Sequence, residues 1–253
     1  MKVDLKKIAR SVQVLAPGFQ EARFAMHRKA LHLLGTTWRP DAEAIRHFQL
    51  EEPVIADIGA NRGFSISSFL MLKPKARIVA FEPLAHLAEI LRVRYKAIAN
   101  VTIHSCALGS SDAQMTIYIP IYRGFVFDPL ASLHYDEAAN WVNGDRFYFF
   151  DPLKLQIEEQ HVRVRRLDDF GIEPDIIKIL AQGHEPAIVE GGETTIRRYE
   201  PAIMAAARIP SIDSCLRDLG YTRYAFRDSR FVLEAEGHTS SWYLKSKHLK
   251  MFG

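Results

Sequence analysis

The chain has 253 residues, enough for one large α/β domain with a cap or for two small domains. Its apolar content of 48% and charged content of 25% are ordinary for a globular protein, and no apolar run approaches the roughly 20 residues that span a bilayer. The amino terminus is charged rather than signal-like, and Cys106 and Cys215 are too few for a disulfide framework. These features predict a cytoplasmic protein with reduced thiols.

The net charge of +3 is unevenly distributed, because the first 40 residues carry eight lysines and arginines against two acids. This excess fits either an arm that meets an anionic partner, such as RNA, or the solvated faces of short helices. We favour solvated faces, since no basic run is long enough for a nucleic-acid tail and aromatic residues are not interleaved with the charges. Nucleic acid is therefore not an expected partner.

Short helices are expected before the first strand of a sheet, over residues 3–16, over residues 19–34 and from Pro40 onward. The first of them carries apolar residues at helical spacing: Leu5, Ile8, Val12 and Leu15. We expect residues 1–50 to form a helical cap that covers one edge of the sheet or the ligand cleft.

The stretch from Pro53 to Pro83 predicts a strand, a glycine loop, a helix and a second strand that ends in an acid. Residues 54–58 form an apolar run broken only by Asp57, which suits a buried parallel strand. The loop reads Gly59-Ala60-Asn61-Arg62-Gly63, and Ser65 is expected to cap the following helix. The second strand, residues 78–81, is followed by Glu82. This arrangement is half of a nucleoside-binding α/β sheet.

The spacing of the loop glycines limits the class of ligand. G-x-x-x-G is not the dinucleotide spacing, and no G-K-[ST] occurs in the chain, so neither a dinucleotide loop nor a P-loop is expected. Glu82 can accept both ribose hydroxyls, the helix amino terminus can hold a carboxylate, and Asp57 can bond loop amides or a ligand ammonium. Adenosine, carboxylate and ammonium together describe S-adenosylmethionine. The alternative is an ordinary strand–turn–helix without a ligand.

The middle of the chain departs from regular periodicity. After strands near residues 101–107 and 115–119, residues 120–160 are rich in aromatic side chains, and Asn143-Gly144 predicts a hairpin turn. A long aromatic excursion in a compact protein is usually functional. We expect residues 120–160 to form the substrate side of the site.

The remaining chain again alternates between expected strands and helices. Apolar strands at residues 175–180 and 201–207 enclose a helix over residues 183–199, and several closing strands follow residue 220. This pattern predicts an α/β protein whose residues 51–253 form a doubly wound, mostly parallel sheet with an antiparallel terminal hairpin.

Several motifs, in this order, resemble those of the FkbM-type family of S-adenosylmethionine-dependent methyltransferases. They are D57-I-G-A-N61, F81-E82-P83, A107-L108-G109, A131-S132-L133, L167-D168-D169, I177-K178-I179 and G183-x-E185. The resemblance covers roughly residues 53–220. It implies a Rossmann-like class I methyltransferase fold and O-methylation of a sugar, a glycolipid or a small metabolite.

The resemblance also assigns residues to the cofactor. The expected S-adenosylmethionine contacts are Asp57, Gly59, Ala60, Asn61, Gly63, Glu82 and Leu108. No cluster of side chains has metal-ligand spacing, so no metal is expected. The sequence is also compatible with an oligomer.

The catalytic half departs from the family. Its pattern after Ile-Lys-Ile is Asp-x-Glu-Gly-x-Glu, whereas this chain has Leu180 and Gln182 in place of the first two acids, and the next strand leads to Arg208 instead of an acid. We expect His184 or Glu185 to serve as the base, although His184 could equally cap the helix or face solvent. The competing hypothesis is a catalytically weakened relative that binds the cofactor and serves as a regulatory or scaffold partner.

Overall fold

The computed structural model describes residues 4–207 and 209–252, so Lys2 and Arg208 lie outside the described part of the chain. The chain forms two compact units. The sheet unit comprises Arg28–Ala113 and Arg163–Gly253, and the smaller unit comprises Met1–His27 and Gln114–Val162. The domain boundary that the sequence suggests at residue 50 stays a prediction.

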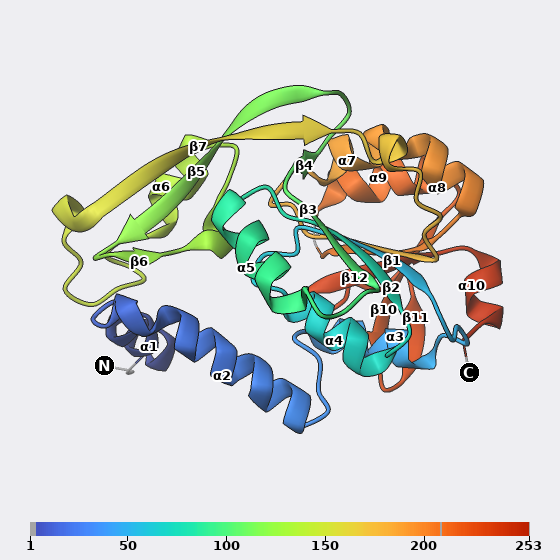
Figure 1. Ribbon diagram of the computed structural model, residues 1–253, viewed down its shortest axis with the longest axis horizontal. Coiled ribbons are helices and arrows are strands. Elements are labelled where there is room, and N and C mark those ends of the chain that lie inside the picture. The colour runs from blue at the N-terminus through green and yellow to red at the C-terminus, as the bar shows by residue number, and fades with distance from the viewer. Residues whose placement is uncertain (1–3, 208, 253) are drawn as a thin grey trace. The chain divides into compact units, whose positions relative to one another are not determined.

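The sheet unit is built on an eight-stranded sheet (Figure 1). Its strands are β1 (Val54–Ile58), β2 (Arg77–Phe81), β3 (Val101–His104), β8 (Ile176–Ile179), β9 (Ala202–Ala206), β10 (Thr222–Arg227), β11 (Arg230–Leu233) and β12 (Ser240–Leu244). Their order is β11-β10-β12-β9-β8-β1-β2-β3. The pairs β3–β2, β2–β1, β1–β8 and β8–β9 are parallel, whereas β12 runs antiparallel to β9 and β10, and β11 runs antiparallel to β10. The predicted mostly parallel sheet with antiparallel closing strands is confirmed.

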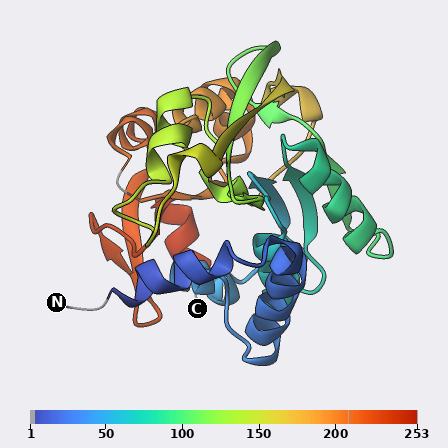
Figure 2. The same ribbon diagram turned by 90° about the vertical axis from the view of Figure 1, so that its left-hand side faces the viewer.

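Helices cover both faces of this sheet. They are α3 (Ala44–His47), α4 (Phe64–Leu72), α5 (Ala85–Tyr95), α7 (Glu185–Gly191), α8 (Glu193–Tyr199), α9 (Pro210–Asp218) and α10 (Ser246–Lys250). In β2, Ile78 belongs to a core that includes residues of α3, α4 and α5, and the next residue, Val79, belongs to a core with residues of α7, α8 and α9. Successive strand residues point to opposite faces, which explains this alternation. Figure 2 shows the two helix groups with strands between them.

The segment before β1 is tied to the last strands of the same unit. In the 3-10 helix η2 (Pro40–Glu43), the buried Asp41 accepts the backbone N–H of Thr239 at 2.9 Å and of Ser240 at 3.0 Å. The Trp242 indole N–H donates to the Asp41 carbonyl at 2.8 Å. Residues 36–48 therefore form part of the sheet unit rather than a separate layer.

The smaller unit has its own aromatic core. It contains α1 (Leu5–Gln13), η1 (Pro17–Phe19), β6 (Phe125–Val126), η3 (Asp128–Leu130), α6 (Tyr135–Trp141) and η4 (Pro152–Lys154). Three elements run from one unit into the other: α2 (Gln20–Leu33), β5 (Ala113–Tyr122) and β7 (Leu155–Arg165). The buried core of the smaller unit consists of Val14, Tyr122, Phe125, Phe127, Val142 and Phe147. The aromatic excursion is thus a folded structure that buries many of its own rings.

Three local expectations are wrong. Asn143-Gly144 does not join two strands; its Asn143 side chain accepts the Asp145 N–H at 3.0 Å in an irregular turn after α6. The helix expected over residues 183–199 is interrupted at Gly192 and becomes α7 and α8. The capping role of Ser65 is also wrong, because the N-cap of α4 is Gly63. A turn dipeptide or an apolar period predicts a local preference, and tertiary contacts decide which preference prevails.

Candidate functional site

The glycine loop follows β1 and makes a sharp left-handed path into α4. Gly59, Asn61 and Gly63 have φ angles of 77°, 48° and 75°. Glycine adopts such angles without strain, and asparagine tolerates them better than most residues do. The Gly59 and Ala60 N–H groups both donate to the Phe81 carbonyl at the end of β2, at 3.0 and 3.1 Å. The loop is therefore fixed at the carboxyl ends of two neighbouring parallel strands.

Two of these glycines are also required by space. A Cβ atom on Gly59 would lie 2.1 Å from the Leu180 carbonyl oxygen, just beyond the end of β8. A Cβ on Gly63 would lie 2.7 Å from Leu91 Cδ2 and 3.2 Å from the Tyr95 ring of α5. The backbone of the loop therefore packs directly against β8 and α5. Glycine is the residue that permits such a close approach of the main chain.

Glu82 lies where the sequence expects the ribose-binding acid, directly after β2. It is buried, and its carboxylate accepts the N–H of Asn61 at 2.6 Å and the N–H of Leu84 at 2.9 Å. The first bond joins the acid to the glycine loop across the edge of the sheet. Glu82, expected to hold the ribose, and Asn61, expected to hold the methionine end, are therefore adjacent, although 21 residues separate them in sequence.

Asp57 is held within the sheet rather than presented at its edge. Its side chain is fully buried, one oxygen lies 2.9 Å from Lys178 Nζ, and the other accepts the Ser65 hydroxyl at 2.5 Å. Ser65 thus connects α4 to β1 through Asp57. In this geometry Asp57 supports the loop from beneath, and its contact with the ligand stays a prediction.

Lys178 of β8 binds the base of the loop. Its ammonium donates to the carbonyls of Ile58 at 3.1 Å and Gly59 at 2.6 Å, in addition to its ion pair with Asp57. Burial lowers the pKa of Lys178, and the nearby Asp57 carboxylate opposes that effect. The sequence indicates that a lysine in an apolar strand needs a partner and leaves Asp57 and Asp175 as candidates. Asp175 instead accepts the Val54 N–H at 2.8 Å.

Helix α5 supplies further loop contacts that the sequence did not indicate. The Tyr95 hydroxyl donates to the Gly63 carbonyl at 3.0 Å, and Arg94 donates to the Arg62 carbonyl at 2.6 Å. Burial raises the pKa of Tyr95, opposed by the charges of Arg94 and Arg28. The surface of an amphipathic helix carries no sequence signal for a contact with a loop some 30 residues away.

His184 and Leu108 lie near each other through Gly109. Leu108 is buried in the two-residue strand β4 (Ala107–Leu108), which pairs with the end of β7. A Cβ on the next residue, Gly109, would lie 2.9 Å from His184 Nε2, so the imidazole rests directly on that backbone. Gly191 of α7 approaches it too, since its Cβ would lie 1.8 Å from the Gly109 carbonyl oxygen. His184 is half-buried and immediately precedes α7.

Glu185 has a different environment from its neighbour. It is fully buried, and its Oε1 atom accepts the Ala181 N–H at 2.9 Å, which ties the start of α7 to the preceding turn. Gln182, which replaces a family acid, is exposed with a φ of 51°, and Leu180 is half-buried. Of the two candidate bases, His184 is therefore the more accessible one.

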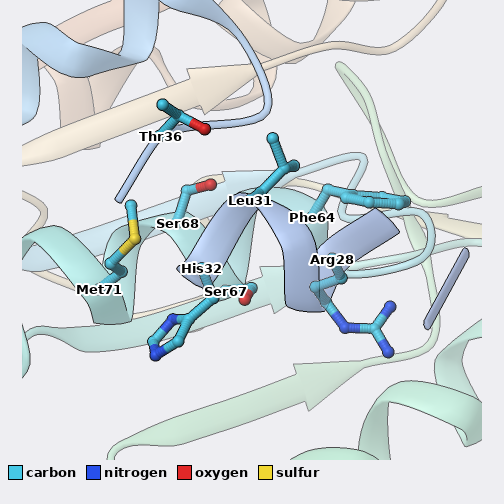
Figure 3. A pocket seen from close by; sticks show the side chains of 8 residues that line it. All are labelled: Arg28, Leu31, His32, Thr36, Phe64, Ser67, Ser68 and Met71. Atoms are coloured by element: carbon cyan, nitrogen blue, oxygen red, sulfur yellow. The ribbon is translucent and has the colours of Figure 1, made fainter. Parts of the chain in front are cut away.

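Two hollows in the sheet unit do not include the expected cofactor-binding acids or the candidate bases in their lining. One is between the carboxyl-terminal half of α2 and α4, where the Arg28 guanidinium lies over the Phe64 ring at 5.9 Å (Figure 3). The other, about 470 Å³, is at the amino ends of β1 and β2 and is lined by residues such as Val54, Arg77 and Asp175. Neither is lined by Asp57, Glu82 or His184.

Residues 4–207 and 209–252 contain no group of three or more His, Cys, Asp or Glu side chains placed to hold a metal ion. Within the same ranges, no helix has the length and apolar character needed to cross a membrane.

Comparisons with known proteins agree with the motifs. The family model described as the methyltransferase FkbM domain matches residues 57–224, which is more than half of the chain. The chain is 28% identical over 153 residues to the 2-O-methyltransferase NoeI of Sinorhizobium fredii, covering 58% of this chain and 60% of that protein. It therefore spans about 60% of the length of this curated relative.

Solved structures give weaker matches. A methyltransferase FkbM from Methylobacillus flagellatus is 16% identical with a TM-score of 0.48, over 76% of this chain and 44% of that one. An O-methyltransferase from Bacillus cereus in complex with SAH is 13% identical with a TM-score of 0.36, over 87% of this chain and 74% of that one.

Proposed function

Since this chain belongs to the FkbM methyltransferase family, we propose that it is an S-adenosylmethionine-dependent O-methyltransferase. The acceptor is a hydroxyl of a sugar, a glycolipid or a small metabolite. The observation that carries the proposal is the bond of 2.6 Å between the Glu82 carboxylate and the Asn61 N–H, which joins the acid after β2 to the glycine loop after β1. The similar 2-O-methyltransferase supports transfer to oxygen.

The residues present fit the cofactor. Gly59 and Gly63 have no room for a side chain, so the loop backbone stays packed against β8 and α5. Glycine at these positions also lets a ligand approach the main chain. In the proposal, Glu82 receives the ribose hydroxyls, while Asn61 and Gly63 line the methionine end and Leu108 adjoins the adenine. Asp57 and Lys178 hold the loop in place from within the sheet.

The reaction requires an acceptor hydroxyl placed in line with the methyl group and freed of its proton. When bound, S-adenosylmethionine supplies the electrophilic methyl group. Positioning of the acceptor can lower the activation barrier by about 7–11 kcal/mol. A general base typically increases the rate by about 10²–10⁴-fold. We assign proton acceptance to His184, which is half-buried beside Gly109, and a positioning role to the buried Glu185.

A second candidate is a relative that binds the cofactor without turnover. It is favoured by Leu180 and Gln182, which replace acids of the family pattern, and by the burial of Glu185. Both candidates place the protein in the cytoplasm, and the free thiols of Cys106 and Cys215 support this location.

Calorimetry and product analysis separate these candidates. We expect S-adenosylmethionine to bind the full chain, and Glu82→Ala to weaken that binding at least tenfold. No binding heat at millimolar cofactor would contradict both candidates. Binding without any methylated product, over a panel of hydroxylated saccharides, glycolipids and small metabolites analysed by mass spectrometry, would favour the second.

A further inference from the structure

Helix α1 of the smaller unit exposes its apolar face. Leu5, Ile8 and Val12 follow each other at intervals of three and four residues, so they lie on one side of the helix. Leu5 is 76% exposed, Val12 59% and the following Leu15 69%, and no residue of α1 is buried. A helix of a globular protein normally turns such a stripe toward its core, and a contiguous exposed one marks an interaction surface.

The other side of the helix is the one that is packed. Lys7 donates to the Gly144 carbonyl at 2.7 Å, and the Ser11 hydroxyl accepts the Tyr148 N–H at 2.8 Å. The Arg10 guanidinium lies over the Trp141 ring at 5.4 Å. Val14, one residue beyond the helix, is 3% exposed within the aromatic core of the unit. Polar contacts therefore fix α1 with its apolar stripe turned outward.

A neighbouring loop also exposes an aromatic ring. Phe149 follows Tyr148, which contacts α1, and its side chain is 93% exposed. Its φ is 52°, a left-handed angle that is costly for a bulky residue, and its carbonyl accepts a bond of 3.3 Å from Arg123. Strain of this kind persists mainly at functional positions. The ring is thus held outward by the surrounding backbone.

The charge around the stripe is basic. Helix α1 and its N-cap carry three bases, Lys6, Lys7 and Arg10, against one acid, Asp4, and Lys7 and Arg10 belong to the packed side. Lys6 is exposed on the helix that carries the stripe. Two copies of this chain joined through the stripe would bring like charges together, whereas an anionic lipid surface would meet both the apolar stripe and the basic charges. A short basic amphipathic helix of this kind lies in the interface of such a membrane.

We propose that Leu5, Ile8, Val12, Leu15 and Phe19 form a docking surface for membranes that contain anionic lipids. We call these residues the α1 surface. Phe19, at the end of η1, which follows α1 in the chain, is 73% exposed. Docking through the α1 surface is peripheral, with the helix in the plane of the headgroups, and it does not depend on methyl transfer.

The test is sedimentation of the full chain with vesicles. One set contains phosphatidylcholine alone and the other contains about one third phosphatidylglycerol, which gives a negative surface potential. We expect binding to the anionic vesicles, weakened at least tenfold when salt rises to about 0.5 M because added salt screens the charges. The double variant Leu5→Ser, Val12→Ser should lower the partition coefficient at least tenfold, and Lys6→Glu should lower it severalfold.

The matched control is Leu233→Ser, which removes a leucine that is 60% exposed on β11 of the sheet unit. It should bind anionic vesicles like the unchanged chain. Absence of binding to both vesicle sets would overturn the proposal, as would equal losses for control and double variant. A dimer in light scattering that the double variant converts to a monomer, with no vesicle binding, would assign the α1 surface to a second copy. Calorimetry with S-adenosylmethionine tests the proposed enzyme separately.

Discussion

Lys178 and Asp57 form a buried ion pair of 2.9 Å between the adjacent parallel strands β8 and β1. Both side chains are almost wholly shielded from solvent, and the same ammonium bonds the carbonyls of Ile58 and Gly59. Breaking such a pair leaves an uncompensated charge in a medium of low dielectric constant. The pair therefore links the stability of the sheet to the conformation of the cofactor loop.

Lys178→Met should lower the free energy of unfolding by about 3–5 kcal/mol, measured by chemical denaturation, because Asp57 stays buried without its partner. The matched control is Lys75→Met, whose ion pair with Glu52 at 3.2 Å is exposed and should change stability by less than about 0.5 kcal/mol. The double variant Asp57→Asn, Lys178→Met should be less destabilised than Lys178→Met alone. Equal losses in the two lysine variants would refute this role of the buried pair.

Gly59→Ala should weaken S-adenosylmethionine binding at least tenfold, or by about 1.4 kcal/mol. Its Cβ would meet the Leu180 carbonyl at 2.1 Å and force the loop away from β8, in addition to the strain of a φ of 77°. Gly171→Ala is the control, since Gly171 has a φ of 59° with no atom near its Cβ. Calorimetry should find that Gly171→Ala binds S-adenosylmethionine with unchanged affinity. A similar loss of affinity in both variants would show that backbone strain alone is responsible.

His184→Gln should reduce the methyl-transfer rate by about 10²–10⁴-fold with little change in cofactor affinity, as expected for loss of a base. Glu185→Gln should keep the rate within about tenfold, because glutamine retains an oxygen that can accept the Ala181 N–H. The comparison uses initial rates at saturating S-adenosylmethionine, with the cofactor affinity of each variant measured by calorimetry. Full activity of His184→Gln would exclude it as the base.

Acid should destabilise the protein through His248. Burial lowers the pKa of His248 to about 4 from the usual 6.5. Its Nδ1 accepts the Lys245 N–H at 2.8 Å, and its Nε2 lies 2.8 Å from the Glu200 carbonyl. A ring nitrogen that accepts a hydrogen bond carries no proton, so this arrangement requires the neutral imidazole. The surrounding charges are Lys245, Lys247 and Glu200. Between pH 6.5 and about 4 the unfolded chain binds the extra proton, so the free energy of unfolding falls as the pH falls.

The loss over this window is at most roughly 3 kcal/mol. Denaturation curves at several pH values should show it, and His248→Gln should flatten the slope between pH 6.5 and about 4 while lowering stability at pH 7. An unchanged slope in that variant would assign the acid sensitivity to other groups. His47, on α3 and packed near Phe226 and Phe252, gives a control in the variant His47→Gln, which should keep the slope.

The sequence by itself determined the alternation of strands and helices in the sheet unit, the glycine loop, the acid after β2 and the family. These features depend on residues close together in the chain: an apolar run of about five residues, glycines at fixed spacing and an acid at a strand end. The same local rules failed at Asn143-Gly144 and at Ser65, where contacts with distant residues decide the conformation.

Only the tertiary structure decided which charges meet and which faces are covered. Asp57 and Lys178 are 121 residues apart, and nothing in either local pattern distinguishes Asp57 from Asp175 as the partner. Helical spacing at Leu5, Ile8 and Val12 fixes a common face but not its direction, because the direction depends on Lys7 and Ser11 bonding residues 144 and 148. A periodic pattern specifies neighbours along the chain, and burial and charge pairing depend on neighbours in space.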